Sequence, residues 1–149
     1  MVKNLVAALA LWFLGSVALA GIVEDNTTYK NPYCGCCAKW IEHMQANGFD
    51  LAVKDTDQMN EIKAELGVPV EMQSCHTTKI GNYFIEGHIP AEIVRRLLTE
   101  ANPDIVGIAA PGMPAGANVP GMEVHDRRTE YKVYAKTRSG EIIVYDTVK

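Results

Sequence analysis

Cys34-Gly35-Cys36-Cys37 places three of the chain's four cysteines side by side, and the rest of the chain can be interpreted outward from this stretch. It holds a C-x-x-C pair, Cys34 and Cys37, with a third thiol between them. A C-x-x-C at the start of a helix is typical of thiol–disulfide exchange or of soft-metal binding. The free N–H groups and the dipole of a helix start stabilise thiolates, which favours both chemistries. A buried disulfide with one inert thiol is the purely structural alternative.

The residues that follow the cysteines have a helical period. Four apolar side chains lie at positions i, i+3, i+4 and i+7: Cys37, Trp40, Ile41 and Met44. Asn47-Gly48 ends this run, so the pattern predicts one amphipathic helix. Trp40 and Met44 are interpreted as core residues. A short strand is predicted just before the cysteines, over residues 27–33.

The remaining sequence alternates strand and helix patterns up to a closing hairpin. The pattern predicts a strand over residues 49–53, a helix capped by Asp57, a hairpin turning at Gly81-Asn82, a helix opening at residues 87–90, and a last hairpin from residues 131–137 and 141–148. Residues 102–122 are rich in Gly, Pro and Ala and predict a long functional loop. The order is that of a thioredoxin-like fold. We therefore predict an α/β, thioredoxin-like domain with a mixed central sheet flanked by helices, a Gly/Pro/Met-rich loop and a C-terminal β-hairpin.

This strand order brings distant residues to the cysteine stretch. In a thioredoxin-like sheet the hairpin strands run antiparallel to the first strand, so the third strand starts, and the fourth ends, where the first strand ends. Cys75 and His88 are then expected beside Cys34. His76 is predicted to point to the opposite face of the sheet and to be structural. His43 is predicted to be solvated, and His125 to follow the loop without joining the site.

Two Pro-Gly-Met tripeptides, ending at Met113 and Met122, are the second unusual feature. A methionine in a glycine-rich loop has little core to fill, although packing beneath the loop is one explanation. A thioether is a good ligand for few biological metals, chiefly Cu(I), which thiolates and imidazoles also bind. Together with the cysteines, the two methionines favour copper. No paired carboxylates, Ser-His-Asp set or phosphate-binding loop stands out.

The first twenty residues predict a cleaved signal peptide. Lys3 precedes an apolar run over residues 5–14, and Ala18-Leu19-Ala20 forms an A-x-A cleavage site. The expected mature chain is residues 21–149, a single domain without a membrane anchor, and its expected location is the periplasm. It carries 13 basic and 18 acidic side chains, a net charge of −5. Such an acidic chain without a basic stripe is a poor match for nucleic acid.

Five motifs, in this order, resemble the CopG-type copper-resistance proteins, an exported metal-binding family. The motifs are residues 33–40 (YCGCCAKW), 74–77 (SCHT), 86–91 (EGHIPA), 111–114 (PGMP) and 120–124 (PGMEV). The similarity covers nearly all of the expected mature chain, roughly residues 28–145. It implies a thioredoxin-like fold, a cysteine-bridged centre of several copper ions, a role in periplasmic copper handling with other copper-handling proteins as partners, and interconversion of Cu(I) and Cu(II). The implied metal ligands are Cys34, Cys36, Cys37, Cys75, His88, Met113 and Met122.

Three functions remain open from the sequence. A copper protein with a redox-active centre is favoured. A passive copper carrier would use the same ligands without turnover. A thiol–disulfide oxidoreductase would need only the C-x-x-C pair and would have no use for Cys36, Cys75 or the methionines.

Overall fold

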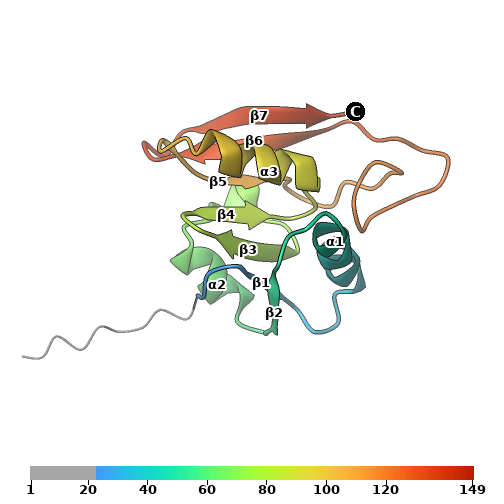
Figure 1. Cartoon of the computed structure of the whole chain (residues 1–149), viewed down its shortest axis with the longest axis horizontal. Coiled ribbons are helices and arrows are strands. Elements are labelled where there is room, and N and C mark those ends of the chain that lie inside the picture. The colour runs from blue at the N-terminus through green and yellow to red at the C-terminus, as the bar shows by residue number, and fades with distance from the viewer. Residues whose placement is uncertain (1–22) are drawn as a thin grey trace, which may run out of the picture.

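A computed structural model of the chain describes residues 23–149, which form one seven-stranded mixed sheet with helices on both faces (Figure 1). The predicted signal peptide, residues 1–20, lies outside the described residues. The strands are β1 Thr27–Lys30, β2 Ala52–Asp55, β3 His76–Ile80, β4 Tyr83–Glu86, β5 Ile105–Ala109, β6 Tyr131–Thr137 and β7 Ile142–Val148. The helices are α1 Gly35–Ala46, α2 Met59–Glu65 and α3 Ala91–Glu100, with a 3₁₀ turn, η1, at Val70–Met72.

The strand order across the sheet is β2-β1-β3-β4-β5-β6-β7. β1 pairs in parallel with β2, and β4 with β5, while the other neighbours are antiparallel. The mixed sheet flanked by helices is confirmed, and its first four strands with α1, α2 and α3 are compatible with the thioredoxin-like expectation. The closing hairpin, β6 and β7, is also confirmed and extends the sheet at the end opposite β2.

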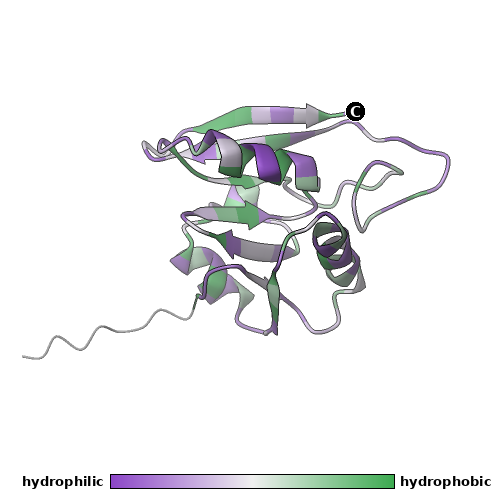
Figure 2. Ribbon diagram, in the orientation of Figure 1, coloured by the Kyte–Doolittle hydropathy of each residue, from purple (hydrophilic) through white to green (hydrophobic). Residues whose placement is uncertain are grey.

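The helices divide between the two faces of the sheet. Side chains of α1 and α3, including Trp40, Met44 and Leu97, share one core cluster with Ile85 and Ile108 of the sheet. Figure 2 shows hydrophobic and hydrophilic residues alternating along α3, as expected for a helix with one buried face. The interpretation of Trp40 and Met44 as core residues is confirmed, since both are fully buried.

A smaller cluster occupies the other face of the sheet. It consists of Val68 and Met72, from the segment that joins α2 to β3, together with Phe84 and Ala109 of the sheet. The segment between α2 and β3 is thereby packed onto the sheet just before Cys75.

Strand register fixes which chain segments meet at one edge of the sheet. The last residue of β1, Lys30, pairs with the first residue of β3, His76. The last residue of β4, Glu86, pairs with Thr77 of β3 and with Ala109 at the end of β5. The segments carrying Cys34, Cys75, His88 and Pro111 therefore all leave the sheet at the same rim, as the strand order predicted for the first three.

Two predictions about local structure are wrong, and the strand predicted over residues 49–53 lies further along the chain, at Ala52–Asp55. Residues 102–122 are not one loop, because residues 105–109 form β5 within the sheet, with Ile105, Ile108 and Ala109 buried. The Gly/Pro/Ala composition of the surrounding segment obscured this short strand. Asp57 does not cap α2. The N-cap of α2 is Gln58, whose N–H donates to the hydroxyl oxygen of Thr56 at 3.0 Å.

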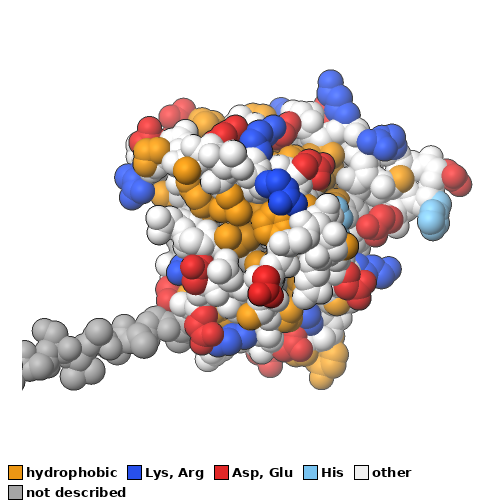
Figure 3. Space-filling view, in the orientation of Figure 1, with side chains coloured by type: hydrophobic (Ala, Val, Ile, Leu, Met, Phe, Trp, Pro, Cys, Tyr) orange, Lys and Arg blue, Asp and Glu red, His pale blue; other side chains and the backbone are white. Residues whose placement is uncertain are grey.

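No helix within residues 23–149 is long and apolar enough to cross a membrane. On the face shown in Figure 3, lysines and arginines are interspersed with aspartates and glutamates around a hydrophobic centre. That face carries no broad basic patch.

Candidate metal centre

The first part of the site is the turn between β1 and α1. The side chain of Asn31 accepts the N–H of Tyr33 at 3.0 Å, and its carbonyl accepts the N–H of Cys34 at 3.0 Å. This turn places Cys34 at the N-cap of α1, with Cys36 and Cys37 in its first turn. Cys34 and Cys37 form a disulfide, and the sulfur of Cys36 lies 3.5 Å from that of Cys34. Cys36 and Cys75 are free.

The second part is the segment Ser74-Cys75, just before β3. Gly87 packs against it so closely that a Cβ on Gly87 would lie 2.7 Å from the side chain of Ser74. Its φ of +77° is also one that residues with a side chain rarely adopt. Glycine at position 87 therefore lets the strand end of β4 approach the segment that carries Cys75.

The fold brings all four sulfur atoms together. Those of Cys34, Cys36, Cys37 and Cys75 lie within 4.8 Å of one another, as expected from the strand order. Burial raises the pKa of the Cys75 thiol to about 12, and the neighbouring Cys36 thiol adds to the rise. Cys75 is thus a thiol in the metal-free protein, and a bound cation would be needed to stabilise its thiolate at neutral pH.

His88 also joins the site. Its Nε2 lies 3.1 Å from the sulfur of Cys75, and its Nδ1 lies 2.7 Å from the carbonyl oxygen of Pro120. A carbonyl can only accept, so Nδ1 carries the proton and Nε2 presents a lone pair to the sulfur. Burial lowers the pKa of His88, although the bond to Pro120 opposes this. A neutral imidazole whose second nitrogen donates to a carbonyl is the usual arrangement of a metal-ligating histidine.

His76 departs from the sequence prediction. It was expected on the opposite face, but its Nδ1 lies 3.3 Å from the sulfur of Cys75, and its ring packs against Trp40 and His88. The expectation assumed that Cys75 belongs to the strand and that neighbouring side chains therefore alternate. β3 begins only at His76, so Cys75 lies outside the strand and alternation does not separate the two. Burial lowers the pKa of His76 well below its usual value.

Both Pro-Gly-Met segments adjoin the cysteine segments through their glycines. The carbonyl of Gly112 accepts the hydroxyl proton of Ser74 at 2.6 Å. A Cβ on Gly121 would lie 2.6 Å from the carbonyl oxygen of Cys36, so only glycine fits there. Met113 itself is half exposed, and Met122 packs against the main core cluster. Their part in metal binding remains a prediction.

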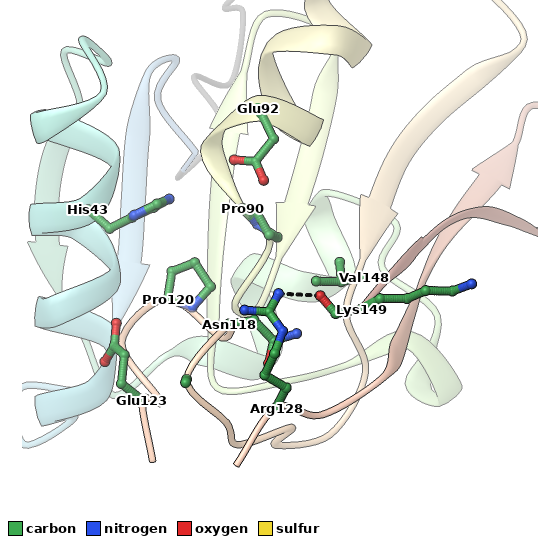
Figure 4. Close-up of a pocket in the computed structure, with 10 residues that line it drawn as sticks. His43, Pro90, Glu92, Asn118, Pro120, Glu123, Arg128, Val148 and Lys149 are labelled. Atoms are coloured by element: carbon green, nitrogen blue, oxygen red, sulfur yellow. Dashed lines mark hydrogen bonds between the residues drawn. The ribbon is translucent and has the colours of Figure 1, made fainter. Parts of the chain in front are cut away.

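The other two histidines, His43 and His125, belong to neither group of potential metal ligands around Cys75. His125 is exposed. His43, predicted to be solvated, is half-buried, and its Nε2 accepts the N–H of Ala91 at the start of α3. It lines a cavity of about 350 Å³ together with Pro120, Glu123 and Arg128 (Figure 4). In that view Arg128 donates to the carbonyl of Lys149, and the cavity contains none of the seven predicted ligands.

A buried ion pair that sequence reasoning missed adjoins the segment that carries Cys75, through the backbone of Ser74. Lys63 of α2 and Glu86 of β4 form a salt bridge, and both are almost completely buried. Thr77 donates to Glu86 at 2.5 Å, and the N–H of Ser74 donates to the same carboxylate at 2.6 Å. Burial raises the pKa of Glu86, while Lys63 opposes the rise. No local sequence signal marks this pair, because its members come from two elements far apart in the chain.

Residues 72–123 match a family described as "Protein of unknown function, DUF411". Among solved structures, one of the copper resistance protein CopG, Form 2, has 42% sequence identity and a TM-score of 0.77, and it aligns over 83% of this chain and 96% of its own. This chain belongs to the CopG family of copper resistance proteins. A second CopG structure, Form 1, gives 43% identity and a TM-score of 0.76 over 82% of this chain and 94% of its own. No curated protein sequence matches the chain.

The donor set of this CopG-family chain fits a soft metal. Two segments supply sulfur atoms, and His88 adds an imidazole whose Nδ1 donates to a carbonyl. Thiolates and imidazoles are ligands that both Cu(I) and Zn(II) accept. The metal-capable groups in residues 23–149 are Cys34, Cys36, Cys37 and Cys75 and, sharing Cys75, the set Cys75, His76 and His88. The disulfide must be reduced before all four sulfurs can act as ligands, a step that consumes two electrons and two protons.

Proposed function

We propose that this chain binds copper through Cys34, Cys36, Cys37, Cys75 and His88 and serves copper resistance. The observation that carries the proposal is the convergence of four sulfur atoms within 4.8 Å from two distant segments. A purely structural disulfide needs only Cys34 and Cys37, and it would leave the free cysteines Cys36 and Cys75 without a function. The family name supports copper as the metal.

The finer part of the proposal concerns the number of ions and their chemistry. Four thiolates in one group are enough to bridge several Cu(I) ions, so we propose a cysteine-bridged centre holding more than one copper, with Met113 and Met122 as neutral thioether donors. Copper in such a centre supplies one-electron chemistry, which would allow the protein to interconvert Cu(I) and Cu(II). The signal-peptide pattern of residues 1–20 supports a periplasmic location.

One observation favours a second candidate function. The disulfide between Cys34 and Cys37 is the oxidised form of a C-x-x-C pair at a helix start, as a thiol–disulfide oxidoreductase would have it. Cys37 is fully buried and Cys34 is partly exposed, so one sulfur is accessible for exchange. This function leaves Cys36, Cys75 and the ligand-like bonding of His88 unexplained, so we rank it second.

Metal competition separates these functions. The reduced protein is offered Cu(I) and Zn(II) together and its bound metals are counted by native mass spectrometry. We expect more than one Cu(I) per chain and preference over zinc, because thioethers and bridging thiolates suit Cu(I), whereas zinc is satisfied by four thiolates alone. A single zinc with no copper, together with robust disulfide reductase activity, would contradict the proposal and favour the oxidoreductase.

A further inference from the structure

The disulfide between Cys34 and Cys37 has one sulfur that a second molecule can reach. Cys37 is completely buried, whereas Cys34 is partly exposed at the N-cap of α1. All four sulfurs can act as metal ligands only after this disulfide has accepted two electrons and two protons. The free cysteines, Cys36 and Cys75, could supply them only by forming a new disulfide in its place. The electrons must therefore come from another molecule.

The surface beside the disulfide carries highly exposed hydrophobic side chains. Tyr33, next to Cys34, is 93% exposed and Val70 is 81% exposed, the two highest values among the large hydrophobic side chains of residues 23–149. Met113 is 51% exposed. A single exposed hydrophobic residue is normal on a protein surface, but several around one site mark an interaction surface. We refer to Tyr33, Val70 and Met113 as the apolar rim.

Hydrogen bonds of Gln73 connect two parts of the apolar rim to the metal centre. Gln73 lies two residues before Cys75. Its N–H donates to the carbonyl of Val70 at 3.2 Å, and its own carbonyl accepts the N–H of Gly112, the residue before Met113, at 3.3 Å. These two segments therefore border the sulfur group beside Cys75, while the turn before α1 borders it beside the other three cysteines.

Acidic side chains flank the apolar rim. Asp57 lies beside the turn before α1, where the side chain of Asn31 donates to it at 3.4 Å, and Glu71 directly follows Val70. Both carboxylates belong to exposed residues, and neither forms a salt bridge within residues 23–149. A partner with basic side chains around its contact face would complement them.

We propose that the apolar rim is the docking surface for a protein dithiol that reduces this disulfide, and that the contact face of this partner is apolar and basic. A thiolate of the partner attacks the sulfur of Cys34. A new S–S bond forms between the two proteins, the bond between Cys34 and Cys37 breaks, and Cys37 leaves as a thiolate that takes up a proton. The second thiol of the partner then attacks the partner's own sulfur, which releases Cys34 as a thiol. Two electrons and two protons have then passed from the partner, now a disulfide, to this chain.

This reduction would precede copper loading. That consequence rests on the proposed copper binding, because the metal can use all four sulfurs only in the reduced protein. The docking does not depend on copper, since an oxidised C-x-x-C pair needs the same electrons in a thiol–disulfide oxidoreductase. Reduction rates and metal binding can therefore be measured separately.

Three dithiols with different surfaces test the docking on the oxidised protein. The first is a synthetic C-x-x-C peptide flanked by apolar residues and lysines, the second has glycine and serine in the flanks, and the third is dithiothreitol. Thiol titration follows each reduction, and each rate is divided by the rate of the same dithiol with oxidised glutathione, which cancels differences in thiol reactivity. We expect the apolar, basic peptide to react about 10-fold faster than the Gly/Ser peptide, with a smaller advantage at high salt.

Tyr33→Ser and Val70→Ser test the apolar rim itself. Both side chains are exposed, so both variants should fold, and dithiothreitol should reduce them as fast as the parent. Reduction by the apolar, basic peptide should slow about 3- to 10-fold in each variant. Val144→Ser is the matched control, because Val144 is 51% exposed but lies in β7 and should not affect either rate.

The point of attack can be located in a Cys36→Ser background, where the probe cannot move to the neighbouring sulfur. Acid quenching during reduction, followed by peptide mapping, should find the apolar, basic peptide bonded to Cys34. A peptide bonded to Cys37 would refute the order of attack.

Two further results would overturn the proposal. One is an equal rate for the two peptides, or a rate that neither Tyr33→Ser nor Val70→Ser changes. The other is that these substitutions slow only the transfer of Cu(I) from a methionine-containing peptide, which would make the occupant a copper donor. If the parent reduced by dithiothreitol bound no Cu(I), the proposed copper function would be wrong, and the reduction rates would still decide the docking.

Discussion

Two buried polar clusters flank the Ser74-Cys75 segment from opposite sides of the sheet, and they differ in how far their polar groups are already bonded. On the α2 side, Lys63, Glu86 and Thr77 are bonded to one another, and Glu86 also accepts the backbone N–H of Ser74. On the α1 side, the sulfur atoms and two imidazoles lie together, and the thiols of Cys36 and Cys75 are free. The saturated cluster can stabilise the fold but can bind nothing further. The cluster on the α1 side still has sulfur and nitrogen atoms that could bind a metal ion, as a binding site requires.

This difference predicts that changes on the α2 side alter stability and changes on the α1 side alter metal binding. The largest stability effect is expected for Lys63→Met, which leaves Glu86 buried without its cation. Breaking a buried ion pair in this way costs about 3–5 kcal/mol of unfolding free energy. Urea unfolding of the metal-free protein measures it.

The double variant Lys63→Met/Glu86→Leu is the matched control and should recover much of the loss, because no uncompensated charge remains. An exposed pair, Lys54 with Glu24, provides a second control, and Lys54→Met should change stability little. If Lys63→Met unfolds at the same urea concentration as the parent, the stabilising role of the α2 cluster is wrong.

On the α1 side, Cys75→Ser should have the largest effect on copper. It removes the one sulfur contributed by the second segment while keeping a small polar side chain. The apparent Cu(I) affinity should fall by more than the about 10- to 100-fold typical of changes to residues that support ligands. A competition titration with a Cu(I) chelator measures this, and His88→Ala should have a smaller effect because it removes one terminal donor. Unchanged affinity in Cys75→Ser would separate Cys75 from the site.

The methionines extend the comparison, because their segments adjoin the cysteine segments through Gly112 and Gly121 while the sulfur group itself contains neither side chain. Met113→Leu and Met122→Leu together should cost less than about 1.5 kcal/mol of stability, since leucine is of similar volume. Cu(I) affinity should fall selectively, with disulfide reductase activity unaltered. Equal Cu(I) affinity in the double variant and the parent would assign both thioethers to packing.

The smallest effect concerns pH. Burial holds the pKa of His76 below the value it has in the unfolded chain, so the unfolded state binds more protons as pH falls below about 6.5. Stability of the metal-free protein should therefore be full above this pH and decline below it, by up to about 1.4 kcal/mol per pH unit for each such histidine. His76→Phe should make the decline shallower. An identical slope in the variant would show that His76 is not held neutral by the fold.

The sequence predicted most of what depends on local pattern. The helix at Cys37, the hairpin at Gly81 and the closing hairpin all carry strong periodic or turn signals, and the strand order placed Cys75 and His88 correctly. It failed where one residue decides the outcome. His76 was assigned to the wrong face because the prediction placed Cys75 inside the strand, where neighbouring side chains point to opposite faces. β3 begins only at His76, so this rule does not apply to the two residues. The pair Lys63–Glu86 could not be found, since only the tertiary fold brings α2 and β4 together.

The central claim is that sulfur from both segments surrounds the metal, and X-ray absorption at the copper K-edge tests it most directly. The Cu(I)-loaded parent should show a first shell dominated by sulfur, with a nitrogen contribution that disappears in His88→Ala and fewer sulfurs in Cys75→Ser. Copper–copper scattering should also be present if the thiolates bridge several ions. A first shell of nitrogen and oxygen, unchanged by either substitution, would contradict the account.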